Sequence, residues 1–128
     1  VLEAGLGLGV ASKIILSSPQ VEKLFKIESN PSVIASYDRN DPRHVVINSK
    51  FEYFISSYNP LVEGLRFDFI FIDTYYYCDE DLYPELLEVV HKSKELLKPN
   101  GKLLVWLDEL IPEEDKRKFL EMNIGLGL

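Results

Sequence analysis

The stretch VLEAGLGLG, residues 1–9, sets the expectations for the rest of the chain. Two apolar residues lead through an acid into three glycines at alternate positions, Gly5, Gly7 and Gly9. An apolar run from Val10 to Ile15 follows. Glycine tolerates positive φ and has no Cβ, so a ligand can touch the backbone there. The pattern predicts a buried strand, a tight loop and a helix start, where free N–H groups favour a negative group of a nucleotide-like ligand.

A second apolar run, Leu24–Ile27, ends at Glu28. In a doubly wound sheet, an acid at the tip of the second strand meets the ribose hydroxyls of a bound nucleoside. The glycine spacing departs from the dinucleotide pattern, because Val10 stands where that pattern has its third glycine. The alternative interpretation is a tight strand–helix turn followed by a chance acid.

Apolar periodicity predicts five strands that alternate with helices. The strands are expected at residues 1–4, 23–28, 44–47, 67–73 and 102–107, and the helices at 8–17, from 31, from 50, at 82–97 and from 112. Residues 67–73 are apolar almost throughout, which is typical of a central parallel strand. The chain is therefore predicted to be one domain, 1–128, of the α/β class, with a Rossmann-like doubly wound parallel sheet in the order 3-2-1-4-5.

Local patterns add finer expectations. The first helix is expected to bury Val10, Ala11, Ile14 and Ile15, and the third to bury Phe51, Phe54, Ile55 and Tyr58. Asn48 or Ser49 is expected to cap the third helix, and residues 98–101 to form a turn. After the last helix too few residues remain for the antiparallel strand pair that often ends such sheets. The strand at 102–107 would then be an exposed edge, which either the tail at 124–128 covers or a second chain pairs with in a homodimer.

Composition narrows the class of partner. The 128 residues carry a formal charge of −7, which disfavours nucleic acid and suits a neutral or cationic small-molecule substrate, unless the acidity serves only solubility. No apolar run approaches the roughly 20 residues that span a bilayer, so no membrane partner is expected. Cys78 is the single cysteine, which precludes an internal disulfide and fits a cytoplasmic location.

Ligands of open parallel sheets bind outside the carboxyl ends of the strands. Asp73 ends the fourth predicted strand, where its carboxylate could orient a cationic amine or guanidine, or accept its proton. The alternative role for Asp73 is a turn or helix cap. Thr74 and Tyr75 follow it, and the aromatic rings of residues 75–77 could wall a substrate pocket. His44 and His91 lie on separate elements, so no metal site is expected.

Four stretches, residues 1–9, 25–31, 67–73 and 96–103, resemble a class I S-adenosylmethionine-dependent methyltransferase. The resemblance implies that the glycine loop holds the methionine part of S-adenosylmethionine, Glu28 the ribose hydroxyls, and Asn48 and Ser49 the adenine edge. The residues expected to bind this cofactor are Glu3, Gly5, Leu6, Gly7, Gly9, Glu28, Ser29, Asn48, Ser49 and Asp73.

The segment from Phe67 to Tyr75 is similar to guanidinoacetate methyltransferase and its protein-arginine relatives, although Tyr76 replaces a usual proline. This likeness implies methyl transfer to a small cationic or guanidino nitrogen, with Asp73, Thr74 and Tyr75 as catalytic residues. Residues 41–43, with Glu28 and Asp73, also resemble spermidine synthases. The alternatives to a methyltransferase are thus an aminopropyltransferase, or a non-catalytic S-adenosylmethionine-binding module that works with a partner.

Overall fold

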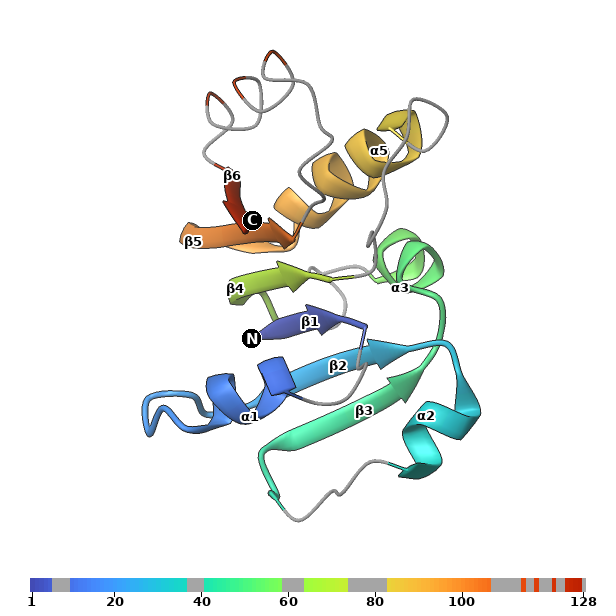
Figure 1. Ribbon diagram of the computed structural model, residues 1–128. Coiled ribbons are helices and arrows are strands. Elements are labelled where there is room, and N and C mark those ends of the chain that lie inside the picture. The colour runs from blue at the N-terminus through green and yellow to red at the C-terminus, as the bar shows by residue number, and fades with distance from the viewer. Residues whose placement is uncertain are drawn as a thin grey trace.

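A computed structural model describes residues 1–5, 10–36, 41–58, 64–73, 83–106, 114, 117, 121 and 124–127. Figure 1 shows the strands side by side in one sheet, with the helices packed around it. The strands are β1 (Leu2–Ala4), β2 (Leu24–Glu28), β3 (His44–Asn48), β4 (Phe67–Ile72), β5 (Leu97–Trp106) and β6 (Ile124–Gly127). The helices are α1 (Val10–Leu16), α2 (Pro31–Ser36), α3 (Phe51–Ser57) and α5 (Tyr83–Lys94).

The strand order is β3-β2-β1-β4-β5-β6, and every pairing between neighbours is parallel. The predicted α/β class and the order 3-2-1-4-5 are therefore confirmed. Although β1 has only three residues, it lies at the centre and pairs with both β2 and β4. Because all strands run the same way, their carboxyl ends meet at one edge of the sheet, on the right in Figure 1.

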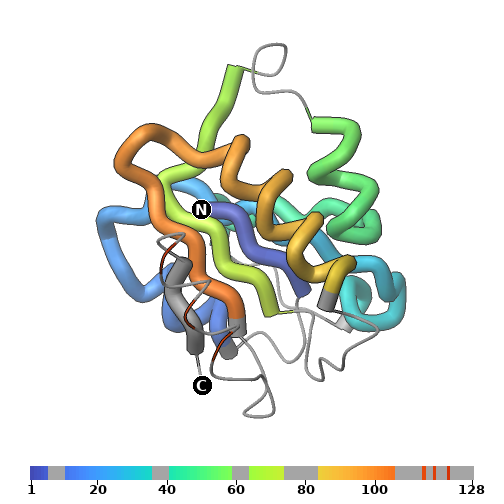
Figure 2. The backbone as a smooth tube through the Cα atoms, turned by 90° about the horizontal axis from the view of Figure 1, so that it is seen from above, coloured from blue at the N-terminus to red at the C-terminus, as the bar shows by residue number. Residues whose placement is uncertain are grey.

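The two faces of the sheet are buried differently. Alternate strand residues such as Leu2, Ile27 and Ile70 join a buried apolar cluster with side chains from α3 and α5. Each fully buried aliphatic side chain of this kind contributes about 1.5–3 kcal/mol. Figure 2, which shows the molecule from above relative to Figure 1, has α1 on the side of the sheet away from α3 and α5. The α1 side of β1 and β2 buries Glu3 and Lys26, which are both charged.

The first helix presents a different face from the one that its apolar residues predict. Ile14 is 67% exposed, whereas the hydroxyl-bearing Ser12 is fully buried. Ser12 faces the sheet because it bonds to the carboxylate of Glu3. The orientation of α1 is therefore set by the hydrogen bond between Ser12 and Glu3, at the expense of leaving Ile14 exposed.

The third helix also begins differently from the prediction. Lys50 occupies the N-cap position and makes no side-chain cap hydrogen bond. The Ser49 hydroxyl donates to the Lys50 carbonyl instead, so neither Asn48 nor Ser49 supplies the expected cap. Phe51 and Ile55 are buried as predicted.

Strand β5 contains the segment that was expected to be a turn. Phe67 pairs with Leu97, whereas Phe69 pairs with Lys102, so residues 98–101 bulge out of the ladder. At Gly101 a Cβ would lie 3.0 Å from the Phe67 carbonyl oxygen and 2.9 Å from a Leu97 methyl carbon. The bulge therefore requires glycine for close backbone approach.

The tail forms β6, which pairs with β5 from Leu103 opposite Ile124 to Trp106 opposite Gly127. This confirms the expectation that the tail covers the edge of β5. The strand is parallel to β5, an arrangement that the sequence did not predict. Most of the helix expected from Pro112 falls outside the described residues.

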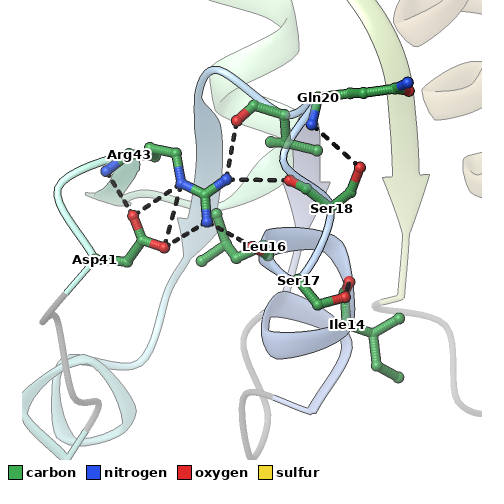
Figure 3. Close-up of polar contacts among 8 residues, drawn as sticks. Ile14, Leu16, Ser17, Ser18, Gln20, Asp41 and Arg43 are labelled. Carbon is green, nitrogen blue, oxygen red and sulfur yellow. Dashed lines mark hydrogen bonds and ion pairs between the residues drawn. The ribbon is translucent and has the colours of Figure 1, made fainter.

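At the amino ends of the strands, Arg43 ties β3 to the end of α1 (Figure 3). Its guanidinium donates to the carbonyl oxygens of Leu16, Ser18 and Val21 and pairs with the Asp41 carboxylate at 2.7 Å. Arginine suits this role because its planar fork carries five donors. The segment that resembled spermidine synthases thus joins two elements at the sheet end opposite to the predicted site.

We expect Gly101→Ala to lower the free energy of unfolding by about 1–3 kcal/mol, because the added methyl group meets backbone atoms that cannot move independently. Urea denaturation measures the change. Asn100→Ala, at the exposed neighbouring position, is the control and should change stability by less than about 0.5 kcal/mol. Equal stability of the two variants would show that the bulge can relax around a side chain.

Hydrogen bonds from Arg43 lower the pKa of Asp41 from 3.8 to about 2. A carboxyl whose pKa is lower in the folded state stabilises the fold above its unfolded pKa, and this contribution disappears as pH falls through the folded pKa. Asp41→Asn should therefore melt at a lower temperature than the wild type at pH 7, and the gap should close between about pH 4 and pH 2. Asp68→Asn, at the exposed partner of Lys98, is the control and should show no such gap. A gap for Asp41→Asn that persists at pH 2 would contradict the assignment.

Candidate functional site

Backbone hydrogen bonds extend the central ladder by one residue at the carboxyl edge. The Gly5 N–H donates to the Ile27 carbonyl at 2.9 Å, and the Asp73 N–H donates to the Ala4 carbonyl at 3.1 Å. The register therefore brings Asp73, Gly5 and Glu28 side by side at the tips of β4, β1 and β2. Two carboxylates thus flank a residue without a side chain.

Gly5 has φ +87°, in the left-handed region that favours glycine. A residue with a side chain would be strained in this conformation. The predicted use of Gly5 as the start of a ligand loop therefore fits its conformation.

One row below Gly5, Glu3 of β1 is paired with Lys26 of β2. Both side chains are almost completely buried, and the Glu3 Oε1 lies 2.6 Å from the Lys26 Nζ. This contact is an ion pair rather than a well-aligned hydrogen bond, because Oε1 has no donor in good geometry. Ser12 of α1 bridges the two charges: its hydroxyl donates to Glu3 Oε2 at 3.2 Å and accepts from the Lys26 ammonium.

Burial and charge pairing act against each other at these groups. Burial raises the pKa of Glu3 and lowers the pKa of Lys26, and in each case the partner opposes the shift. Burial also raises the pKa of the half-buried Asp73, again opposed by Lys26. Lys26 is therefore the cation that offsets the cost of placing these carboxylates out of water.

A cavity of about 320 Å³ opens at the carboxyl edge next to Gly5. Its charged lining consists of three glutamates and one lysine: Glu28, Glu52, Glu85 and Lys50. The Glu28 Oε2 accepts a hydrogen bond from the Asn30 N–H at 2.9 Å, which orients the carboxylate at the cavity wall. Because negative groups dominate the described lining, the cavity favours hydroxyl donors and cations over phosphates.

A larger hollow of about 690 Å³ lies at the opposite edge, where Lys23, Phe25 and Phe67 mark the amino ends of β2 and β4. Size alone does not make it the better candidate. Parallel sheets bind ligands at the carboxyl ends of their strands, where the loops that follow the strands converge. We therefore assign the candidate site to the smaller cavity.

The predicted site residues fall into three groups. Gly5, Glu28, Ser29 and Ser49 line the cavity, and Asp73 lies at the same edge of the sheet. Glu3 is buried in the ion pair beneath it, and Asn48 is exposed at the tip of β3. The remaining predicted positions lie outside the described residues: Leu6, Gly7, Gly9, Thr74, Tyr75, Tyr76 and Tyr77.

Sequence reasoning missed Lys26 and Ser12. A signal for Lys26 was present, because a lysine interrupts the apolar run of β2 two residues before Glu28, just as Glu3 stands two residues before Gly5. Opposite charges at matching places on neighbouring parallel strands indicate a cross-strand ion pair. Ser12 could not be found this way, because the apolar residues around it predict another helix face.

Neither a membrane-spanning helix nor a metal-binding cluster is found among the described residues. No helix in this part of the chain is long and apolar enough to cross a membrane. The same residues contain no group of three or more His, Cys, Asp or Glu side chains that could hold a metal ion.

Comparison with known proteins supports the fold. No protein-family model matches the chain, and a search of curated proteins finds no match. Among solved structures, the chain is similar to precorrin 8W decarboxylase from Methanobacterium thermoautotrophicum, with a TM-score of 0.61 and 17% identity. The match covers 94% of this chain and 58% of that chain. This chain therefore spans little more than half the length of the protein it resembles.

The prediction of a class I methyltransferase is corrected by this comparison. The similar structure is that of a decarboxylase, and no family model supports the methyltransferase resemblance. Methyl transfer to a cationic nitrogen, and the aminopropyl and partner-dependent alternatives attached to the same assignment, are withdrawn. The binding of S-adenosylmethionine stays a prediction, because the comparison does not test which ligand the chain binds. The assignment failed because a glycine loop and acids at strand tips indicate only which edge of the sheet binds a ligand. The same edge supports many different reactions in proteins of this fold class.

Proposed function

We propose that this chain binds a small, positively charged, hydroxyl-bearing nucleoside at the carboxyl edge of its sheet. The observation that carries the proposal is the row formed by Asp73, Gly5 and Glu28, in which two carboxylates flank a glycine with positive φ. Vicinal ribose hydroxyls are donors that a strand-tip carboxylate accepts. S-adenosylmethionine, expected from the sequence, is the candidate ligand because it combines a ribose with a sulfonium cation.

The charge of the site favours this ligand over phosphorylated nucleotides. Glu28, Glu52 and Glu85 outnumber Lys50 in the described lining of the cavity, and Asp73 adds another carboxylate at the same edge. A diphosphate or triphosphate would meet repulsion there, whereas a sulfonium or ammonium group would be attracted. The formal charge of −7 for the whole chain acts in the same direction.

A second candidate function comes from the similar decarboxylase. The shared fold, at a TM-score of 0.61, favours it, and a decarboxylase by definition acts on a carboxylate. The described cavity lining carries a single cation, Lys50, to receive such a group. Charge therefore favours the cationic nucleoside over an anionic substrate as the ligand of this cavity.

A cytoplasmic location and a small-molecule partner are also part of the proposal. Cys78, as the single cysteine, is compatible with a reducing cytoplasm, where the chain would meet metabolites of this kind. The net negative charge supports a small-molecule partner in preference to nucleic acid.

We expect Glu28→Gln to weaken the binding of S-adenosylmethionine by about 1–3 kcal/mol, because the ribose hydroxyls lose their charged acceptor. Isothermal titration calorimetry on the wild type and the variant measures this change. Glu88→Gln removes a glutamate on α5 that is 67% exposed, and should leave the affinity unchanged. The proposal fails if the wild type binds no S-adenosylmethionine, or if the two variants bind it equally well.

A second titration tests the need for a cation. S-adenosylhomocysteine has the same nucleoside but a neutral thioether, so it should bind the wild type about 5- to 10-fold more weakly than S-adenosylmethionine, which corresponds to about 1 kcal/mol. Asp73→Asn should reduce this preference, because it removes one of the two carboxylates that flank Gly5 and can attract the sulfonium. Equal affinity of the wild type for the two ligands would place the sulfonium away from Asp73.

A further inference from the structure

Lys26 is a buried charged residue next to the proposed binding site, and no role in ligand binding has been assigned to it so far. Its side chain is fully buried between the sheet and α1, and it does not line the cavity. Four groups face it from the elements packed around it: Glu3 on β1, Ser12 on α1, Glu28 on β2 and Asp73 beyond β4. Three of these four groups are carboxylates, so the ammonium group of Lys26 attracts three anions.

The register explains this arrangement. Lys26 and Glu28 lie two residues apart on β2, so their side chains leave the same face of the sheet. Glu3 is the cross-strand neighbour of Lys26, and Asp73 is level with Gly5, one row higher. Lys26 thus lies beneath the row that is proposed to receive the cationic ligand, with Glu3 beside it.

We propose that Lys26 is a positioning and specificity-determining residue of this site, because it keeps the carboxylate of Asp73 ionised for a cationic ligand while Glu3 limits how much of its positive charge reaches that ligand. The effect of Lys26 on ligand binding rests on the proposed function. Its effect on the proton affinity of Asp73 involves only residues of this chain. The two parts can therefore be tested separately.

Two variants should change the proton affinity of Asp73 in opposite directions. In the double variant Glu3→Leu with Lys26→Met, the pair is replaced by apolar side chains of similar volume, a change that buried ion pairs often tolerate. Asp73 then loses the attraction of Lys26 together with the weaker repulsion of Glu3, and it remains half-buried, so it should bind its proton more tightly. In Glu3→Gln, Lys26 keeps its charge under acid conditions but loses its closest anion, so Asp73 should release its proton more readily.

The experiment is a carbon-13 NMR titration of the Asp73 carboxyl group between about pH 3 and pH 7, the range in which carboxylates titrate. The signal is assigned by its absence from Asp73→Asn. We expect the midpoint to move to higher pH in the double variant and to lower pH in Glu3→Gln. A merely structural role would move both variants in the same direction or leave both at the wild-type midpoint, and either result would overturn the proposal. If Glu3→Gln, which leaves Lys26 without its closest anion, does not fold, the direction of the shift in the double variant decides the question.

Ligand affinity provides the second arm. Calorimetry with S-adenosylmethionine at pH 5 should show about ten-fold weaker binding to the double variant than to the wild type, with the difference shrinking towards pH 8, where Asp73 is ionised in both. Opposite NMR shifts with no binding of S-adenosylmethionine by the wild type would refute the proposed ligand and leave the role of Lys26 intact. Unchanged NMR midpoints with normal binding would refute the role of Lys26 and leave the proposed ligand intact.

Discussion

The ion pair between Glu3 and Lys26 is the interaction on which the centre of this structure depends. Removing two charges from water costs several kcal/mol for each ion, and only close contact with further polar bonds offsets that cost. The 2.6 Å contact and the bridging Ser12 hydroxyl provide this compensation. Removal of one partner from such a pair typically costs about 3–5 kcal/mol, a large share of the 5–15 kcal/mol that keeps a domain folded. Strand pairing, the position of α1 and the candidate site therefore depend on the same pair.

The layered fold could be predicted from sequence because strand burial leaves a strong pattern. The continuous apolar run of β4 and the apolar segment that ends at Glu28 placed these strands within one residue of their observed bounds. Features that depend on contacts between distant segments were not predictable. The exposure of Ile14 follows from a hydrogen bond between Ser12 and Glu3, and the bulge in β5 follows from its register with Phe67 and Phe69. Neither contact is visible in a local pattern.

The candidate site was predictable in part for a related reason. Glu28 ends β2 and Asp73 directly follows β4, and the position of strand ends in a parallel sheet follows from topology. Lys26 was missed because its role depends on its pairing with Glu3 on the neighbouring strand. The reaction could not be predicted, since it depends on where a substrate lies against the site, and strand periodicity carries no record of that. The methyltransferase assignment went wrong at this step, by reading chemistry from a pattern that specifies a fold.

The short central strand has a consequence for how the chain folds. Leu2 of β1 pairs with Ile70 of β4, so about half of the 128 residues separate two neighbours at the middle of the sheet. Closing a loop of that length carries an entropic cost before any contact offsets it, and contacts between distant residues slow folding. During synthesis, β1 and β2 would leave the ribosome with one side of β1 unpaired until β4 follows. The apolar edge of β1 therefore stays open to pairing with other chains until β4 has been made, even though the β5 edge of the finished sheet is covered by β6.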